Sequence, residues 1–441
     1  MSTDQVKESS EEIREKHDRY LFPAVANYYK EPAVMVEGNG SRISDLDGRE
    51  YLDFFGGILT VSVGHANPDV TKAIVAQAGR LSHISTLYPT LPMVELAEKL
   101  VNIAPGKLDR CFFTASGTEA DEFAFNMAQV HTGNMEVIAL RHGYSGRSTL
   151  AQSLTAHSSW RSVPTQIASV KHALAPYCYR CPLRQTYPKC GVACAHDVKE
   201  LIQTTTTGNI AGMLAEPILG VGGFITPPPE YFKIVSEIVR EHGGVFIADE
   251  VQTGFGRTGK NWGIENYGVE PDMMTMAKGI ANGLPLGAVI ATTDIAHSQK
   301  KNTISTFGGN PISCAAANAV QDVIKRDNLA ENCEKQGHVL REGLLRLQKM
   351  FPKTIGDVRG MGLMQAIELV VDETAGDRTP DTQATVALFE ETRKRGLLIG
   401  KGGLYGNVAR IAPMLNATRD EIEEALDILE ASFKSMNEGG S

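Results

Sequence analysis

The regular alternation of helical patterns with short apolar, β-branched runs, between about residues 68 and 311, constrains the fold most. The runs are VIALR after Glu136, IAGMLAEPI from Ile210, GGVFIADEV from Gly243, MMTMAKG from Met273 and LGAVIAT from Leu286. Strands separated by helices require crossover connections, so we expect a mostly parallel sheet covered by helices. Ligands of such sheets bind at the carboxyl ends of the strands.

The sequence on either side of this region has a different character. After about Ala330 come a long amphipathic pattern (HVLREGLLRLQKMF), a strand-like run (GLMQAIELV) and a helix pattern that Thr418 opens as an N-cap. The stretch AVMVEGNGSRISDLDGREYLDFFGG, from Ala33, alternates as β-hairpins do. We therefore expect an α/β protein with a large domain at residues 61–324 and a smaller α+β domain from residues 1–60 and 325–441. The first twenty or so residues are expected to form a charged, loosely held arm.

Composition excludes several classes of partner. The chain has 441 residues, of which 42% are hydrophobic and 22% charged, as is typical of globular proteins. A net charge of -9 leaves no basic excess for nucleic acid or an anionic membrane. The N-terminal stretch MSTDQVKESSEEIREKHDRY lacks an apolar signal segment, and no later stretch approaches the ~20 apolar residues of a membrane span. We expect a cytoplasmic protein.

Four of the seven cysteines cluster in CYRCPLRQTYPKCGVAC, as Cys178, Cys181, Cys190 and Cys194. An odd cysteine count without a signal segment argues against a disulfide framework. The first pair has a common metal-ligand spacing, whereas the second pair is spaced more widely. A metal site stays open on these residues, but we expect packed thiols without metal.

Two apolar strand patterns end in ionisable residues, Asp249 and Lys278. A carboxylate buried without a partner is very costly, and a buried lysine is exceptional. The two could form a structural ion pair. They could also be catalytic, because the pKa of a lysine moves readily on desolvation, as an amine nucleophile requires.

A third element, FFTASGTEADEFAFNMA, leads from an apolar run through Ser116, Gly117 and Thr118 into a helix. Small hydroxyl residues and glycine at a helix N-terminus can form an anion site, although an ordinary N-cap is the commoner use. Beside Lys278 and Asp249 the pattern predicts a phosphate site. Phosphate cup, amine and carboxylate match the three groups by which proteins hold pyridoxal 5'-phosphate: phosphate, aldehyde and ring nitrogen.

A competing motif lies between Gly254 and Gly259, where GFGRTG fits G-x-G-x-x-G after a strand. The dinucleotide fingerprint also needs a helix that opens at the third glycine. The following residues are too rich in glycine and asparagine to begin one. A nicotinamide-dependent oxidoreductase is thus the alternative of a different class, and a nonenzymatic interaction protein is a further alternative.

Five segments, FIADEVQTGFGRTG, MAKGIANGLPLGAVI, TASGTEADEFA, AEPILGVGG and STFGGNPISCAA, resemble those of class III (omega) aminotransferases of PLP fold type I. The nearest resemblance is to alanine-glyoxylate and 4-aminobutyrate aminotransferases. It extends from about Tyr28 to the last helix. It implies a mostly parallel large domain, a smaller α+β domain, pyridoxal 5'-phosphate as cofactor, and a homodimer or dimer of dimers with shared active sites.

The resemblance also implies roles for single residues. Lys278 would bind the cofactor covalently, Asp249 would face the ring nitrogen, and Gln252 would contact the ring hydroxyl. Val251 and Tyr144 would pack on the two ring faces. The other implied residues are Ser116, Gly117 and Thr118 with Thr306 of the second subunit at the phosphate, Glu216 in the cofactor site, and Arg410, Ile58 and Tyr88 at the substrate; none is a metal ligand.

The chain departs from the family pattern at three positions. Ser145 stands where histidine is frequent, and Leu219 stands where glutamine is common. Val221 stands where ornithine and 4-aminobutyrate aminotransferases have a second glutamate, which shields the arginine matched by Arg410. An unshielded Arg410 would favour substrates with a carboxylate near the reacting carbon.

We therefore expect an aminotransferase that moves an amino group from an amine, alanine or an omega-amino acid to a keto acid such as pyruvate or glyoxylate. A 4-aminobutyrate:2-oxoglutarate aminotransferase remains an alternative. A lyase, decarboxylase or racemase on the same fold could also keep every residue named, because these enzymes differ only in which substrate bond lies perpendicular to the ring.

Overall fold

The largest sheet confirms the expected α/β architecture. The computed structural model describes residues 8–163 and 167–438, and within them this sheet has seven strands. In order across the sheet they are β4 (Leu108–Thr114), β10 (Gly287–Thr292), β9 (Met273–Met276), β8 (Val245–Asp249), β7 (Gly212–Ala215), β5 (Val137–Leu140) and β6 (Val170–Ala173). All neighbours are parallel except at β10, which runs antiparallel to both β4 and β9. Only residues 277–286 separate β9 from β10, too few for a crossover helix.

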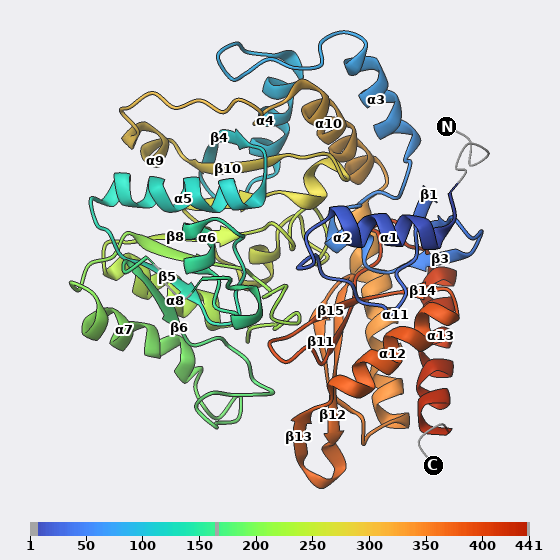
Figure 1. The fold of residues 1–441 in the computed structure, drawn as a ribbon. Coiled ribbons are helices and arrows are strands. Elements are labelled where there is room, and N and C mark those ends of the chain that lie inside the picture. Colours follow the sequence, from blue (N-terminus) through green and yellow to red (C-terminus); the bar gives the residue numbers. More distant parts are fainter. Residues whose placement is uncertain (1–7, 164–166, 439–441) are drawn as a thin grey trace.

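Helices cover both faces of this sheet (Figure 1), and α5 lies on the opposite face from α7 and α8. The helices of this region are α3 (Pro68–Ala78), α4 (Leu91–Ile103), α5 (Gly117–Thr132), α6 (Thr149–Leu154), α7 (Ala193–Thr205), α8 (Tyr231–Glu241), α9 (Thr293–Ser298) and α10 (Pro311–Arg326). All five residues of β8 are buried, as expected for a central strand covered on both faces. None of the described helices is both long and apolar enough to cross a bilayer.

Of two smaller sheets, one combines strands from both ends of the chain and the other is built from C-terminal strands alone. One contains β1 (Met35–Asn39), β2 (Arg42–Asp45), β3 (Glu50–Asp53) and β14 (Leu397–Leu398), and the other β11 (Ile355–Met361), β12 (Met364–Asp372), β16 (Val408–Ile411) and β15 (Gly400–Gly402), with β13 (Asp377–Pro380) on β12. The expected N-terminal hairpins are confirmed, and β14 pairs in parallel with β3. The remaining helices are α1 (Ser10–Tyr20), α2 (Gly56–Leu59), α11 (Leu329–Met350), α12 (Thr382–Lys394) and α13 (Arg419–Glu438). The exact domain boundaries stay a prediction.

The N-terminal arm is more ordered than expected. Residues 10–20 form α1, with a capping box between Ser9 and Glu12. The Ser10 hydroxyl donates a hydrogen bond to Asp47 Oδ1 at 2.8 Å, which ties the helix to the β2–β3 turn. The expected loose arm is therefore wrong for this helix, because cap and side-chain contacts were not visible in the charge pattern. Residues 1–7 lie outside the described residues.

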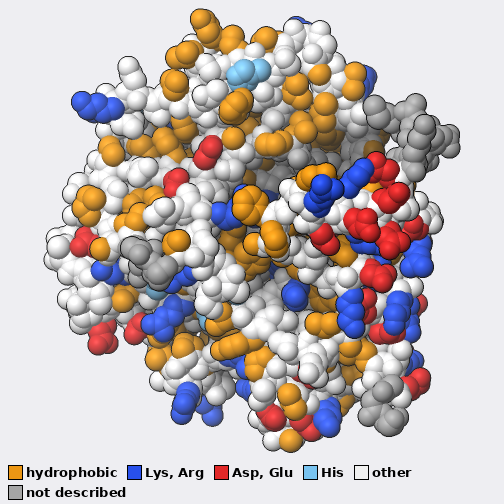
Figure 2. All heavy atoms as spheres, viewed as in Figure 1, with side chains coloured by type: hydrophobic (Ala, Val, Ile, Leu, Met, Phe, Trp, Pro, Cys, Tyr) orange, Lys and Arg blue, Asp and Glu red, His pale blue; other side chains and the backbone are white. Residues whose placement is uncertain are grey.

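An exposed apolar patch joins two segments that are far apart in sequence, and Figure 2 shows hydrophobic side chains gathered on this upper part of the molecule. Thr86 and Ser305 exchange hydrogen bonds, and His83 packs on Phe307 with ring centroids 5.3 Å apart. We call this the 81–94/304–307 patch; its exposed apolar members are Leu81, Leu87, Tyr88, Leu91, Val94, Ile304 and Phe307. Patches of this kind commonly mark interaction surfaces.

Candidate active site

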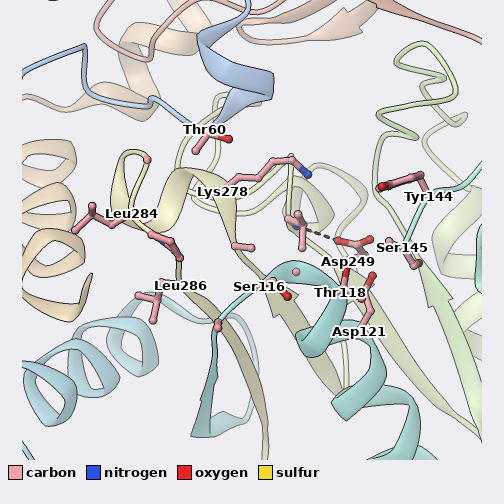
Figure 3. Close-up of a pocket in the computed structure, with 17 residues that line it drawn as sticks. Thr60, Ser116, Thr118, Asp121, Tyr144, Ser145, Asp249, Lys278, Leu284 and Leu286 are labelled. Atoms are coloured by element: carbon pink, nitrogen blue, oxygen red, sulfur yellow. Dashed lines mark hydrogen bonds between the residues drawn. The ribbon is translucent and has the colours of Figure 1, made fainter. Parts of the chain in front are cut away.

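A cavity of about 290 Å³ opens where the carboxyl ends of β8 and β9 meet the N-terminus of α5 (Figure 3). Seven of the residues singled out in the sequence line it: Ser116, Gly117, Thr118, Tyr144, Asp249, Val251 and Lys278. They come from four separate stretches of the chain. Strand order and helix placement thus bring together what the sequence alone could only name separately.

Asp249 is the last residue of β8, and its side chain is buried. Its Oδ1 accepts a hydrogen bond from the Val251 N–H at 3.0 Å. Burial raises the pKa of Asp249 to about 6, against the opposing effects of that hydrogen bond and of the Lys278 charge. The described residues place no cation within ion-pair distance of Asp249, so the structural ion pair with Lys278 is not formed.

Lys278 opens the 3-10 helix η4 (Lys278–Ala281) with a φ of 45°, an uncommon and strained value for a residue with a side chain. The Asn282 side chain fixes the loop by accepting from Ser62 N at 2.7 Å and Val63 N at 2.9 Å. Burial lowers the pKa of Lys278, although nearby carboxylates act against it. A lowered pKa increases the share of neutral amine, which is the nucleophilic form.

The N-terminus of α5 lies below Lys278 (Figure 3) and has the features of an anion-binding helix end. Ser116 Oγ caps the helix by accepting from Glu119 N at 3.3 Å, so the ordinary capping role is real. The next N–H groups, of Gly117 and Thr118, have no partner within the helix and remain available to a ligand. Gly146 lets its loop approach, because a Cβ there would lie 2.0 Å from Thr118 Oγ1 at a φ of 133°.

Glu216 positions Tyr144 from behind the cavity. Its two carboxylate oxygens accept from Tyr144 N at 3.1 Å and from Gly220 N at 2.7 Å. Burial and the nearby Asp249 charge raise the pKa of Glu216 to about 8. The Tyr144 ring also meets Trp160 edge to face, with centroids 5.8 Å apart. Glu216 thus acts on the cavity wall without lining the cavity.

Gln252 lies next to this wall and is buried. Its side chain occupies the space beside Gly220, where an added Cβ would lie 2.1 Å from Gln252 Nε2. Within the described part of the chain, Gln252 Oε1 has no hydrogen-bond partner. The amide therefore has unused hydrogen-bonding capacity.

Glu250 does not belong to the cavity, although it follows Asp249 directly. It accepts from Thr253 Oγ1 at 2.5 Å and from the Gly263 and Ile264 N–H groups at 2.8 Å each. Gly263 and Ile264 begin η3 (Gly263–Tyr267), and turns occupy residues 251–258. No helix opens at the third glycine of the G-x-G-x-x-G match, so the segment supports Glu250 and lacks the dinucleotide geometry.

Arg410, on β16, is buried and held by backbone carbonyls. Its guanidinium donates to Lys401 O from Nε at 3.1 Å and from Nη2 at 2.7 Å, and to Gly220 O from Nη1 at 3.2 Å. It also lies over the Phe55 ring at 4.7 Å and the Phe224 ring at 5.5 Å. Among the described residues no carboxylate is within ion-pair distance of it. Burial lowers the pKa of Arg410.

Besides Glu216, Gln252 and Arg410, three more expected site residues do not line the cavity of a single chain. Ile58, Tyr88 and Thr306 are exposed, and none lines it. Ile58 has a left-handed φ of 68° in α2. Tyr88 belongs to the 81–94/304–307 patch, which also contains Thr306 between Ile304 and Phe307. The roles given to these residues stay predictions.

The cavity also contains residues that the sequence patterns did not single out for the site: Thr60, Asp121, Ser145, Leu284 and Leu286. The signal for Asp121 was present, because it lies four residues after Gly117, on the α5 face that buries Ala124, Phe125 and Ala128. An acid on an apolar helix face is a marked exception to normal burial.

The four clustered cysteines surround a separate cavity of about 20 Å³. Burial raises the pKa of Cys194 to about 12 and that of Cys178 to a lesser extent. In the described ranges, no group of three or more His, Cys, Asp or Glu side chains is arranged to hold a metal ion.

Comparisons with known proteins agree with this geometry. The family model for aminotransferase class-III matches residues 24–433. Alanine–glyoxylate aminotransferase 2 homolog 2, mitochondrial, of Arabidopsis thaliana is 41% identical over 97% of this chain and 88% of its own length; alanine–glyoxylate aminotransferase 2, mitochondrial, of Homo sapiens is 38% identical over 96% and 86%. An amine transaminase from an uncultivated Pseudomonas species, solved in a PLP-bound form, has a TM-score of 0.88 at 31% identity, over 95% of this chain and 98% of that one. The chain belongs to the class III aminotransferases, which use pyridoxal 5'-phosphate.

Proposed function

We propose that the cavity between α5, β8 and β9 holds pyridoxal 5'-phosphate, with Lys278 as the covalent anchor. The N–H groups of Gly117 and Thr118 with the Ser116 and Thr118 side chains would hold the phosphate. Asp249 would face the ring nitrogen, and Val251 and Tyr144 would flank the ring. The observation that carries the proposal is a lysine with a lowered pKa beside a buried carboxylate that lacks an ion pair, both at one sheet edge.

The remaining expected contacts fit the same arrangement. The unused amide of Gln252 would contact the ring hydroxyl, and Glu216 would hold Tyr144 in place. Bound here, the cofactor would supply an electron sink for charge that develops at the substrate's Cα. Lys278, once released from the cofactor, would move the proton at that carbon, while Asp249 keeps the ring nitrogen protonated.

Borohydride reduction followed by peptide mapping tests the anchor. We expect the reduced cofactor on the peptide that contains Lys278, and a turnover loss of about 10⁴-fold in Lys278→Ala. Lys260→Ala, an exposed lysine outside the cavity, is the matched control and should keep both label and turnover. Label on any other lysine would overturn the assignment.

Arg410 supports a small keto acid as the amino acceptor. Its guanidinium is anchored by carbonyls and has no carboxylate partner among the described residues, and Val221 offers none. A substrate carboxylate would act as its partner by accepting two parallel hydrogen bonds from the guanidinium. We therefore propose pyruvate or glyoxylate as acceptor, and alanine, an omega-amino acid or a simple amine as donor. Ile58 and Tyr88 would border the donor. The names of the two reported relatives contain the same acceptor class.

Arg410→Ala separates binding of the carboxylate from the rest of the reaction. We expect the KM for pyruvate to rise about tenfold to a hundredfold, because a charge-assisted contact is lost, while the half-reaction with a neutral amine changes little. Arg410→Lys keeps the charge but cannot donate two parallel hydrogen bonds, so its KM for pyruvate should lie between those of wild type and Arg410→Ala. Equal losses with both substrates, or a wild-type preference for 2-oxoglutarate, would contradict this role.

Product analysis distinguishes the alternatives on the same fold. Incubation with pyruvate and a panel of amines should yield alanine and the carbonyl product of the donor. Loss of carbon dioxide would indicate a decarboxylase, loss of a leaving group a lyase, and interconversion of enantiomers without keto acid a racemase.

We also propose a homodimer or dimer of dimers, in which a second copy covers the 81–94/304–307 patch and contributes Thr306 to its partner's phosphate site. The size and apolar character of the patch support this. Sedimentation should show a dimer or tetramer, and Leu91→Glu should weaken this assembly. A wild-type monomer with full activity would reject the proposal.

A cytoplasmic location likewise stays a proposal, to be tested by cell fractionation.

A further inference from the structure

Asp121 is a second carboxyl group beside Asp249, and nothing described so far gives it a role. It is only 1% exposed, lines the cavity and rises from α5 toward Asp249 (Figure 3). The neighbouring acids of α5 have fixed partners: Glu119 accepts from Ala115 N at 2.7 Å, and Glu122 accepts from the Ser148 hydroxyl. Asp121 Oδ1, in contrast, has no hydrogen-bond partner among the described residues.

An ionised Asp121 would be unfavourable in this place for two reasons. A carboxylate oxygen only accepts hydrogen bonds, so a buried oxygen without a donor loses its solvation without replacement. A charged Asp121 would also face the charge of Asp249 at close range, and two adjacent carboxylates do not ionise together easily. One proton on Asp121 removes both costs, since a neutral carboxyl can donate to the neighbouring carboxylate.

The groups that face Asp121 from the neighbouring elements favour the neutral acid on balance. Burial and the Asp249 charge raise the pKa of Asp121 well above its usual range, and Glu216 adds to this. The hydroxyl groups of Thr275 and Ser145 act in the opposite direction but do not outweigh burial. Lys278 faces the same cluster; burial lowers its pKa, and Asp121 is one of the carboxyl groups that act against that shift.

We propose that Asp121 is a positioning residue, which carries a proton at neutral pH and donates a hydrogen bond to Asp249. The two carboxyl groups would then form a buried pair with a single negative charge. Val251 N already fixes one oxygen of Asp249, and Asp121 would fix the carboxylate from the side of α5. This inference rests on the proposed function, in which Asp249 meets the ring nitrogen.

Infrared spectroscopy of the cofactor-free protein tests the proton directly. We expect a protonated-carboxyl stretching band at pH 7 that shifts in heavy water and is absent from the spectrum of Asp121→Asn. Glu216 and Glu250 also have raised pKa values, so the wild-type minus variant difference is the quantity to measure. Glu122→Gln, on the next position of α5, is the matched control and should keep the band. Identical bands in wild type and Asp121→Asn would overturn the proposal.

Cofactor binding gives a second readout. Asparagine retains a neutral donor, so Asp121→Asn should bind pyridoxal 5'-phosphate within about twofold of wild type, whereas Asp121→Ala should bind about tenfold more weakly. The absorption bands that report ring-nitrogen protonation should shift only in Asp121→Ala. If asparagine is as damaging as alanine, a charged Asp121 is required and the proposal is wrong; unchanged binding in Asp121→Ala rejects it equally. Absence of label on wild-type Lys278 would instead reject the proposed function, and the infrared result does not depend on that outcome.

Discussion

The molecule buries acidic groups in two regions that treat them in opposite ways. In the cavity and directly behind it, Asp249, Asp121 and Glu216 have raised pKa values and no cation within ion-pair distance among the described residues. On β12, Glu368 is completely buried and accepts from Arg359 Nη1 at 2.7 Å, from Arg180 and from Tyr177. Burial acts to raise the pKa of Glu368, but Arg359, Tyr177 and Arg180 outweigh it and the pKa is lowered.

The difference shows how to tell a structural buried charge from a functional one. Around Glu368 the counter-charges belong to the chain itself, so the cluster is complete without a ligand. Around Asp249 the chain supplies burial and a backbone donor, and the compensating cation has to come from elsewhere. A protonated ring nitrogen would meet that need.

Within this comparison, the largest expected effect is on turnover at Asp249. Asp249→Asn should lower turnover about a thousandfold, because a neutral amide no longer favours a protonated ring nitrogen. The melting temperature of the cofactor-free protein should not fall, since no ion pair is broken. Steady-state kinetics and thermal melts of the same preparation measure both. Turnover near the wild-type value would remove the contrast between the two regions.

The opposite result, a loss of stability with nearly unchanged turnover, is expected at Glu368. Glu368→Gln should destabilise the protein by about 3 kcal/mol, because it leaves the Arg359 and Arg180 charges buried with less compensation. Turnover per folded molecule should stay within about a factor of two or three, as the cluster does not line the cavity. Urea unfolding gives the first quantity, and active-site titration with borohydride normalises the second. A large loss of turnover in fully folded Glu368→Gln would show that the two regions are coupled.

A pH-dependent effect, which reaches its full size only at the end of the pH range, sharpens the comparison. The folded pKa of Asp249 is about 6, against an ordinary 3.8, so the folded protein binds more protons between these values and loses stability as pH rises through them. The free energy of unfolding of cofactor-free Asp249→Asn, relative to that of wild type, should therefore rise by up to about 3 kcal/mol from pH 4 to pH 7.

The opposite sign is expected at Glu368, whose pKa is lowered. Its contribution to stability is present above the ordinary value of 4.5 and is lost on acidification, so the loss of stability in Glu368→Gln should become smaller at low pH. Unfolding curves at several pH values test both signs, and parallel curves would contradict them.

Much of the fold and the core of the site follow from local patterns. Alternating apolar runs predict the sheet, and residues at strand ends are predicted to meet at its edge, as Lys278 and Asp249 do. The direction of β10 also has a local cause, in the short connection from β9. The packing of helix α1 could not be predicted in this way, because its hydrogen bond to Asp47 is a tertiary contact.

The rest of the site depends on which groups the fold places side by side. No spacing in the sequence indicates that Asp121 shares its surroundings with Asp249, nor that carbonyls of Lys401 and Gly220 anchor Arg410. Glu250 follows Asp249 directly but has a structural role, because two of its donors are N–H groups of a segment about thirteen residues later. In each case the deciding fact is a through-space neighbour.

The contact between Tyr144 and Trp160 gives the protein a built-in optical reporter. The chain has two tryptophans, and Trp262 is completely buried with its indole N–H donated to Ile103 O at 2.7 Å. Trp160 is 43% exposed and packs on the tyrosine that lines the cavity. Its emission should therefore lie at longer wavelength than that of Trp262 and respond when the cavity fills, while Trp262 provides a constant internal reference. Loading of the cavity could then be followed in real time without any added dye.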